Sequence, residues 1–104
     1  MNLEELTAAM HDFVRAKGWY ENESPRPQTP RNLAISLALE ASEVLEHFQW
    51  NGEVENLEEL GSELADVTLY LLQIASITGI DLEQAILNKL KTNYGRKWEQ
   101  KKNE

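Results

Sequence analysis

Apolar residues recur along this chain at the three- and four-residue spacing of an amphipathic α-helix, in four separate stretches. The first stretch covers residues 3–17 and follows Asn2, which is predicted to form a capping box with Glu5 three positions later. Gly18 is expected to end this helix. All three prolines fall in or directly after residues 19–29, which we therefore predict to be a long loop.

A second helix is predicted after this loop, with Thr29 as its N-cap and Pro30 at its first position. The Asn-Gly turn at residues 51–52 is expected to end it. A third helix, the longest of the four, should begin after Asn56 and continue to Gly79.

The fourth apolar run follows Asp81 and Gln84, a further capping pair, and weakens near Gly95. No stretch shows the strict alternation of a β-strand, so we predict an all-α fold, a four-helix bundle. With 104 residues the chain is long enough for one hydrophobic core and too short for two. Residues 1–104 are therefore expected to form a single domain.

The composition is acidic, because 18 Asp and Glu against 10 Lys and Arg give a net charge of −8. Such a chain repels nucleic acid polymers and anionic membranes, and neither is expected as a partner. Without cysteine there is no disulfide framework and no thiolate nucleophile, so any metal ion would bind carboxylates or imidazole. The N-terminal residues lack the basic patch and apolar run of a signal peptide, and we expect a cytoplasmic protein.

Two pairs of acidic residues lie on helix faces that should be buried. At about 100° per residue, Glu40 falls inside the apolar stripe of the second helix, with Glu43 one turn later. On the third helix, Glu63 lies close in angle to the apolar stripe and Asp66 lies beside it. Isolated buried carboxylates are costly unless they are paired or bound to a cation. If the two helices pack antiparallel, the four carboxylates would converge into an all-oxygen site suited to Mg²⁺ or Mn²⁺.

Each pair alone is more simply explained as a solvated acidic face, but two pairs on consecutive helices favour a metal site. A di-iron carboxylate site would need a histidine three residues after a glutamate. His47 is four residues after Glu43, so the oxygen-only site is the preferred interpretation.

Lys89, Asn93 and Arg96 are spaced by four and three residues on the fourth helix, which aligns them in one stripe. This stripe either binds an anionic ligand such as a polyphosphate, or complements the helix dipole. Trp19 and Trp50 lie at the ends of helices. Each could stack on a nucleobase or serve as a buried anchor or oligomer contact.

From Phe13 to Trp98 the chain resembles the all-α nucleoside triphosphate pyrophosphatases of the MazG-like superfamily, and within them the dCTP pyrophosphatase-like branch. The most specific motif leads from Pro-Arg-Asn-Leu at residues 30–33 into residues 40–50, which end in Phe-Gln-Trp. Residues 63–70, Glu-Leu-Ala-Asp-Val-Thr-Leu-Tyr, resemble the second acidic motif of these enzymes.

The resemblance implies Mg²⁺-dependent hydrolysis of a nucleoside triphosphate, dCTP or similar, to a monophosphate and pyrophosphate. The residues that would hold Mg²⁺, or Mn²⁺ in its place, are Glu40, Glu43, Glu63 and Asp66. The substrate contacts that it implies are Lys89, Asn93 and Arg96 for the phosphates, Tyr70 for the sugar and Trp50 for the base. The chain departs from the branch at Gln28, where its members tend to carry a histidine.

Small proteins of this superfamily usually assemble as dimers or tetramers with sites between chains, so the resemblance implies a homodimer or homotetramer. Two alternatives remain open at this stage. The first alternative to the deoxynucleotide pyrophosphatase is an enzyme of the phosphoribosyl-ATP pyrophosphohydrolase type. The second is a non-catalytic helical module that binds a metal ion or a protein partner.

Overall fold

The computed structural model describes residues 1–50 and 52–96, and within these residues it contains four α-helices and no strand. The bounds of the helices are Leu3–Ala16 for α1, Pro30–Glu46 for α2, Leu57–Ile77 for α3 and Leu82–Gly95 for α4. The predicted all-α class is confirmed. Asn51, in the turn expected to end the second helix, lies outside the described residues. Trp98, the last residue of the family resemblance, also lies outside them.

The helices begin at the caps that the sequence predicts. Asn2 Oδ1 accepts a hydrogen bond from the Glu5 N–H at 2.8 Å, and Glu5 Oε1 accepts one from the Asn2 N–H at 3.0 Å. The side chains that cap the other three helices, each accepting from a backbone N–H three residues later, are Thr29, Asn56 and Asp81. Gly18 and Gly79 follow α1 and α3 with φ of 74° and 80°, a left-handed conformation that ends a helix.

The second helix ends earlier than predicted. α2 stops at Glu46, and the next backbone hydrogen bonds join each N–H to the carbonyl three residues back, as from Phe48 to Leu45 at 2.9 Å. This tighter pattern replaces the four-residue spacing of an α-helix. The helix therefore ends earlier than the Asn51-Gly52 turn near which its end was predicted, and Trp50 lies in a bend beyond the helix.

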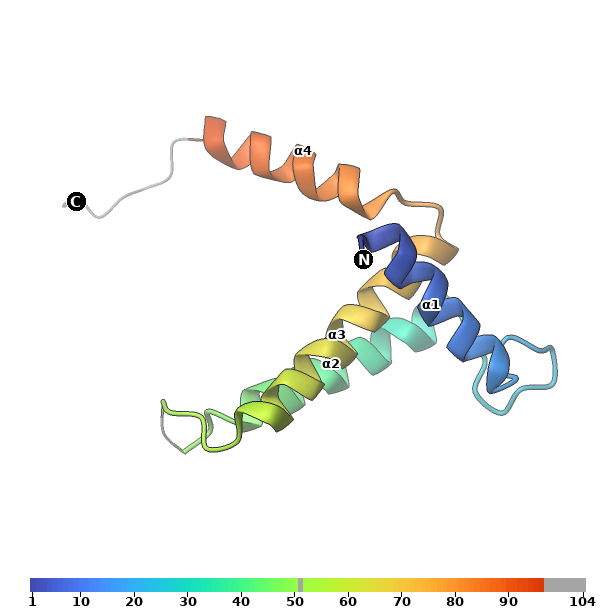
Figure 1. Ribbon diagram of the computed structural model, residues 1–104, viewed down its shortest axis with the longest axis horizontal. Helices are drawn as coiled ribbons and strands as arrows, with labels where there is room; N and C mark the ends of the chain where they lie inside the picture. Colours follow the sequence, from blue (N-terminus) through green and yellow to red (C-terminus); the bar gives the residue numbers. More distant parts are fainter. Residues whose placement is uncertain (51, 97–104) are drawn as a thin grey trace.

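The core lies where α2 and α3 run side by side and α1 crosses α3 (Figure 1). The buried side chains are Met10, Val14, Leu33, Leu72, Gln73 and Ala75. This core is smaller than the apolar seams of the sequence suggest, because Leu45 and Leu64 of those seams are 66% and 49% exposed. One buried residue, Gln73, is polar and must find its hydrogen bonds inside the protein.

α4 extends away from α1 and α2 after leaving the end of α3 (Figure 1). The radius of gyration is 17.1 Å, compared with about 13 Å for a compact domain of 100 residues. The four helices therefore do not close into a bundle within one chain. No single helix of the described ranges is long and apolar enough to cross a membrane. Taken together, α3 and α4 meet this criterion of length and composition, but the pair is bent by 104°.

Apolar side chains remain exposed on α4 and near the α2–α3 turn. Leu87 and Leu90 are 51% and 50% exposed, and Tyr94 is 90% exposed. Beside the turn, Trp50 and Leu57 are 86% and 74% exposed. Large apolar side chains that are exposed close together on one element often mark interaction sites.

Candidate active site

The four carboxylates predicted to bind metal lie on the facing sides of α2 and α3. Glu40 lies close enough to Asp66, and Glu43 close enough to Glu63, for each pair of carboxylates to interact across the two helices. A step of three residues toward the C-terminus of α2 therefore matches a step of three residues toward the N-terminus of α3, which shows that the two helices pack antiparallel. Burial raises the pKa of Glu40, and the charges of the other three carboxylates raise it further.

The same carboxylates have the charge and the donor atoms that a hard divalent cation requires. Partial desolvation and then the nearby charge of Glu63 raise the pKa of Glu43, as expected where carboxylates crowd together. Glu40 Oε1 is buried without a hydrogen-bond partner among the described residues, which leaves an oxygen for a ligand. Within residues 1–50 and 52–96, however, no three Asp, Glu or His are gathered closely enough to hold one ion. The carboxylates stand as two pairs.

Without divalent metal, Glu40 should make the folded chain more stable as the pH falls from about 7 to about 4.5. A carboxyl group whose pKa is higher in the folded than in the unfolded state binds more protons when folded. Protonation therefore favours the fold between the ordinary pKa of 4.5 and the raised value. Thermal unfolding in the presence of a chelator measures the effect.

Glu40→Gln is the matched variant for this measurement, because glutamine mimics the protonated carboxyl group. The variant should unfold at a higher temperature than the wild type at pH 7, and the difference should close as the pH falls. A difference that stays constant with pH would show that the Glu40 carboxylate is not destabilising in the folded chain.

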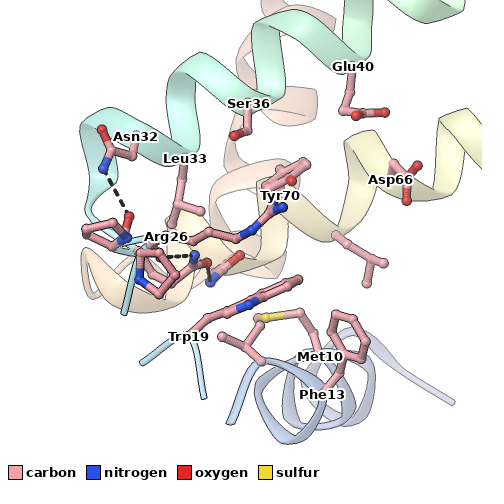
Figure 2. A pocket seen from close by; sticks show the side chains of 16 residues that line it. Met10, Phe13, Trp19, Arg26, Asn32, Leu33, Ser36, Glu40, Asp66 and Tyr70 are labelled. Atoms are coloured by element: carbon pink, nitrogen blue, oxygen red, sulfur yellow. Dashed lines mark hydrogen bonds between the residues drawn. The ribbon is translucent and has the colours of Figure 1, made fainter. Parts of the chain in front are cut away.

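A cavity of about 490 Å³ opens between α1, the loop of residues 19–29, α2 and α3 (Figure 2). Glu40 and Asp66 lie on its α2 and α3 side, and Trp19 lies on its α1 side (Figure 2). Tyr70 lines the cavity one turn beyond Asp66. The volume lies within the range of roughly 300–1,000 Å³ that is typical of small-molecule sites. One end of the cavity is therefore acidic and the other is aromatic.

The aromatic end is built around Trp19. Phe13 packs edge-on against the Trp19 ring at a centroid distance of 5.6 Å, and the Arg26 guanidinium lies 5.4 Å from the ring centre. Asn32 Nδ2 donates to the Pro27 carbonyl at 3.0 Å, which ties the loop to the first turn of α2. The loop is thereby held as one wall of the cavity.

A family model provides the first comparison with known proteins. The model of the MazG-like family matches residues 35–104, which is more than half of the chain. This chain belongs to the MazG-like family. The match includes all four carboxylates of the two facing pairs and Tyr70.

MazG-like relatives of this chain include dCTP pyrophosphatase 1 of Mus musculus, which is 31% identical over 103 residues, and dCTP pyrophosphatase 1 of Homo sapiens, at 30% identity. Each match covers 90% of this chain and 58% of the relative, so the chain spans little more than half the length of these mammalian proteins. A pyrophosphatase from Archaeoglobus fulgidus DSM 4304 is similar in structure, with 31% identity, a TM-score of 0.68 and 86% of each chain covered.

Trp50 lies apart from the cavity of this MazG-like chain. It borders a separate depression near the α2–α3 turn, together with Glu46, His47 and Glu59. With 86% of its surface exposed, Trp50 has no packing role within the described part of the chain. Of the two tryptophans predicted to contact substrate, only Trp19 lines the cavity with the carboxylates.

The cationic stripe of α4 also lies apart from the cavity. None of Lys89, Asn93 and Arg96 lines the space that contains Glu40 and Asp66. Asn93 Oδ1 is buried without a hydrogen-bond partner among the described residues. Within one MazG-like chain, the predicted phosphate contacts and the predicted metal ligands are therefore not brought together.

Sequence reasoning gave no role in the site to His47, Arg26 or the amides of Gln28 and Gln73. His47 Nε2 lies 2.5 Å from Glu63 Oε1, and both side chains are largely buried. The signal for this contact was present in the sequence, because the antiparallel register that places Glu43 opposite Glu63 brings the next turn of α2 to the same carboxylate. No local signal predicts Arg26, which lies in an irregular loop, and Gln28 was noted only as a departure from the dCTP pyrophosphatase-like branch.

Proposed function

We propose that this chain is a Mg²⁺-dependent nucleoside triphosphate pyrophosphatase. Its substrate would be a deoxynucleoside triphosphate, dCTP or a close analogue, and its products a monophosphate and pyrophosphate. The observation that carries the proposal is the single cavity that joins Glu40 and Asp66 to the aromatic surface of Trp19. A nucleotide is a ligand with an anionic end that needs a metal ion and a flat end that stacks.

In this orientation Trp19 would bind the base and Tyr70, between the two ends, would contact the sugar. Mg²⁺ held by Glu40, Glu43, Glu63 and Asp66 would supply charge neutralisation for the phosphates and lower the pKa of the attacking water. One of these four carboxylates would also take the proton of that water as a general base. His47 would hold Glu63 in place through their short hydrogen bond.

The phosphates also need cations, and a second copy of the chain is the source that we propose. α4 carries Lys89 and Arg96 away from the cavity of its own chain, and its apolar residues are left uncovered. A homodimer or homotetramer would cover this surface and bring the stripe toward the carboxylates of a partner. Negative charge grows on the departing pyrophosphate, which Lys89 and Arg96 would stabilise.

Replacing Leu87 with aspartate should therefore dissociate the oligomer and reduce turnover together. Leu87 is half-exposed in the single chain. An aspartate at this position would place a charge in an apolar interface, where an unpaired charge is strongly unfavourable. Light scattering after gel filtration measures the mass. Asn88→Asp adds the same charge at the neighbouring position and is the control. A wild-type chain that is monomeric at micromolar concentration would contradict the shared site.

The experiment that tests the proposed function is a panel of dNTPs, NTPs and modified dCTP with Mg²⁺, in which monophosphate and pyrophosphate are both quantified. We expect equal amounts of the two products. In ¹⁸O-labelled water the label should enter the monophosphate, because attack falls on the α phosphorus. Nucleoside diphosphate with orthophosphate would contradict the proposal. No turnover of any nucleotide would favour the non-catalytic helical module.

A further inference from the structure

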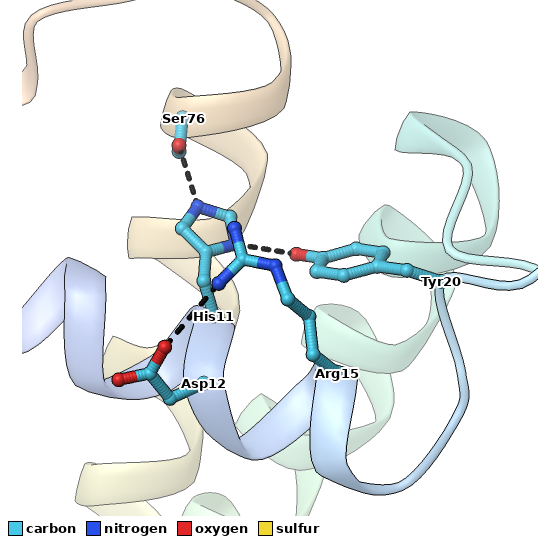
Figure 3. A network of polar contacts seen from close by, with 5 residues as sticks. All are labelled: His11, Asp12, Arg15, Tyr20 and Ser76. Carbon is cyan, nitrogen blue, oxygen red and sulfur yellow. Dashed lines mark hydrogen bonds and ion pairs between the residues drawn. The ribbon is translucent and has the colours of Figure 1, made fainter.

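A chain of hydrogen bonds leads from the surface of α3 through α1 to the cavity (Figure 3). Its members, in order, are Ser76, His11, Tyr20, Gln73, Gln28 and the backbone carbonyl of Arg26. The direction of each bond follows from the chemistry of the groups that it joins. One end of this chain of bonds fixes that direction.

The fixed end is the Arg26 carbonyl, which can only accept a hydrogen bond. The Gln28 side-chain atom 2.6 Å from it must therefore be the amide nitrogen Nε2. The Gln28 oxygen Oε1 then faces Gln73, and it accepts from Gln73 Nε2 at 2.8 Å. A backbone carbonyl in the loop thus sets the orientation of two side-chain amides.

The second N–H of Gln73 donates to the Tyr20 hydroxyl oxygen at 3.1 Å. The Tyr20 proton is then directed to His11 Nδ1 at 2.7 Å, and His11 Nε2–H donates to Ser76 Oγ at 2.7 Å. This arrangement requires neutral His11, and burial followed by the charge of Arg15 lowers the pKa of His11. Every bond from Arg26 to Ser76 therefore has one direction.

The oxygen of Gln73 is left over in this arrangement. Both N–H groups of Gln73 are used, and no described residue donates to its Oε1. Gln73 as a whole is only 3% exposed. Among the described residues, the fully buried side-chain oxygens without a hydrogen-bond partner are Glu40 Oε1 and Asn93 Oδ1. Gln73 Oε1 is not one of these, so it keeps some accessible surface. Gln73 lines the cavity, and we take this oxygen to be the part of its side chain that faces it.

Gln73 lies at the end of the cavity away from the carboxylates. It follows Asp66 by seven residues on α3, about 10 Å along the helix axis, on the same face. Tyr70 lies between the two. A nucleotide whose phosphates approach Asp66 would therefore bring the edge of its base toward Gln73.

We propose that Gln73 selects nucleotides whose base carries an exocyclic amino group, such as cytosine, by presenting a fixed hydrogen-bond acceptor to the base edge. This inference rests on the proposed function of the same site. The amino groups of cytosine and adenine are donors, whereas uracil and thymine present a carbonyl oxygen at the corresponding position. A carbonyl opposite Gln73 Oε1 would leave two acceptors facing each other without a proton.

The first test compares dCTP with dUTP, which differ at this edge and not in the sugar or the phosphates. The wild-type kcat/KM should favour dCTP by at least about tenfold, the cost of one unmet hydrogen bond in a buried site. Titration with the products dCMP and dUMP should show the same preference in Kd, and it requires no turnover. Equal binding of dCMP and dUMP by the wild type would overturn the inference.

Two variants test the residue and the direction of its amide. Gln73→Met removes the acceptor at similar volume and should bring the two monophosphates within about threefold, mainly by weakening dCMP. Gln28→Met removes the group that holds the Gln73 amide, so that the amide is free to turn and offer an N–H. In this variant dUMP should bind more tightly than in the wild type, which general damage to the site would not produce.

Gln84→Met makes the same substitution on α4, outside the chain of hydrogen bonds, and should keep the wild-type preference. Circular dichroism confirms the fold of each variant. A preference for dCMP that survives in Gln73→Met would overturn the role of Gln73. If no nucleotide releases pyrophosphate but dCMP still binds better than dUMP, the proposed function fails and the inference stands. Pyrophosphate released equally well from dCTP and dUTP overturns the inference alone.

Discussion

Replacing Asp66 with asparagine should lower pyrophosphate release by at least about two orders of magnitude while the helices remain folded. Asparagine keeps the volume of the side chain but removes the negative charge that a divalent cation requires. Glu40→Gln should act in the same way, because Glu40 contacts Asp66 across α2 and α3. Initial rates at saturating nucleotide and Mg²⁺ measure the loss.

Unfolding of the metal-free protein separates a catalytic role from a structural one. Removing a carboxylate from a crowded acidic group relieves repulsion, so both variants should unfold at or above the wild-type temperature in a chelator. Glu58→Gln removes one charge from the exposed first turn of α3 and should keep its turnover. Full activity of Asp66→Asn would show that Asp66 does not bind the metal ion. A lower unfolding temperature of this variant would show that the Asp66 carboxylate stabilises the fold.

Replacing Trp19 with alanine should raise KM by about 5- to 150-fold, which corresponds to the roughly 1–3 kcal/mol of stacking on one base. The effect on kcat should be smaller, because stacking is made in the ground state as well as in the transition state. Trp19→Phe keeps an aromatic surface in the same wall and should recover most of the affinity. An unchanged KM in Trp19→Ala would show that the base does not bind against Trp19 in this cavity.

Trp50→Ala in the same assay tests the base contact that the family resemblance implies. Trp50 is 86% exposed and does not line the cavity of its own chain. A rise in KM for this variant would therefore indicate that Trp50 reaches the nucleotide of a partner copy. The Trp19 prediction is independent of that outcome, since Trp19 lies beside the carboxylates in a single chain.

The local elements of the fold followed from short-range chemistry. Asn2 and Glu5 are three residues apart, and their reciprocal hydrogen bonds form as the sequence predicts. Gly18 ends α1 because a left-handed φ of 74° is readily available to glycine. The end of α2 was mispredicted, since the Asn-Gly turn was treated as its stop while the helix changes to tighter hydrogen bonding after Glu46.

The apolar seams gave the faces of the helices but not the extent of their burial. Leu45 and Leu90 keep the spacing of core residues, yet they are 66% and 50% exposed in the single chain. The spacing of apolar residues shows which face of a helix is buried against another surface, but it does not identify that surface. The same gap applies to Lys89 and Arg96, because the sequence shows their stripe but does not show whether a phosphate lies against it.

The four helices, their caps and the two acidic pairs could be predicted from sequence alone, because each depends on residues within about four positions of one another. Tertiary packing places Trp19, rather than Trp50, in one cavity with the carboxylates. It also decided the orientation of Gln73, which is set by Gln28, 45 residues away, and the tautomer of His11, 65 residues from Ser76. Contacts across such separations depend on how a loop and three helices pack, and no spacing within one helix encodes them.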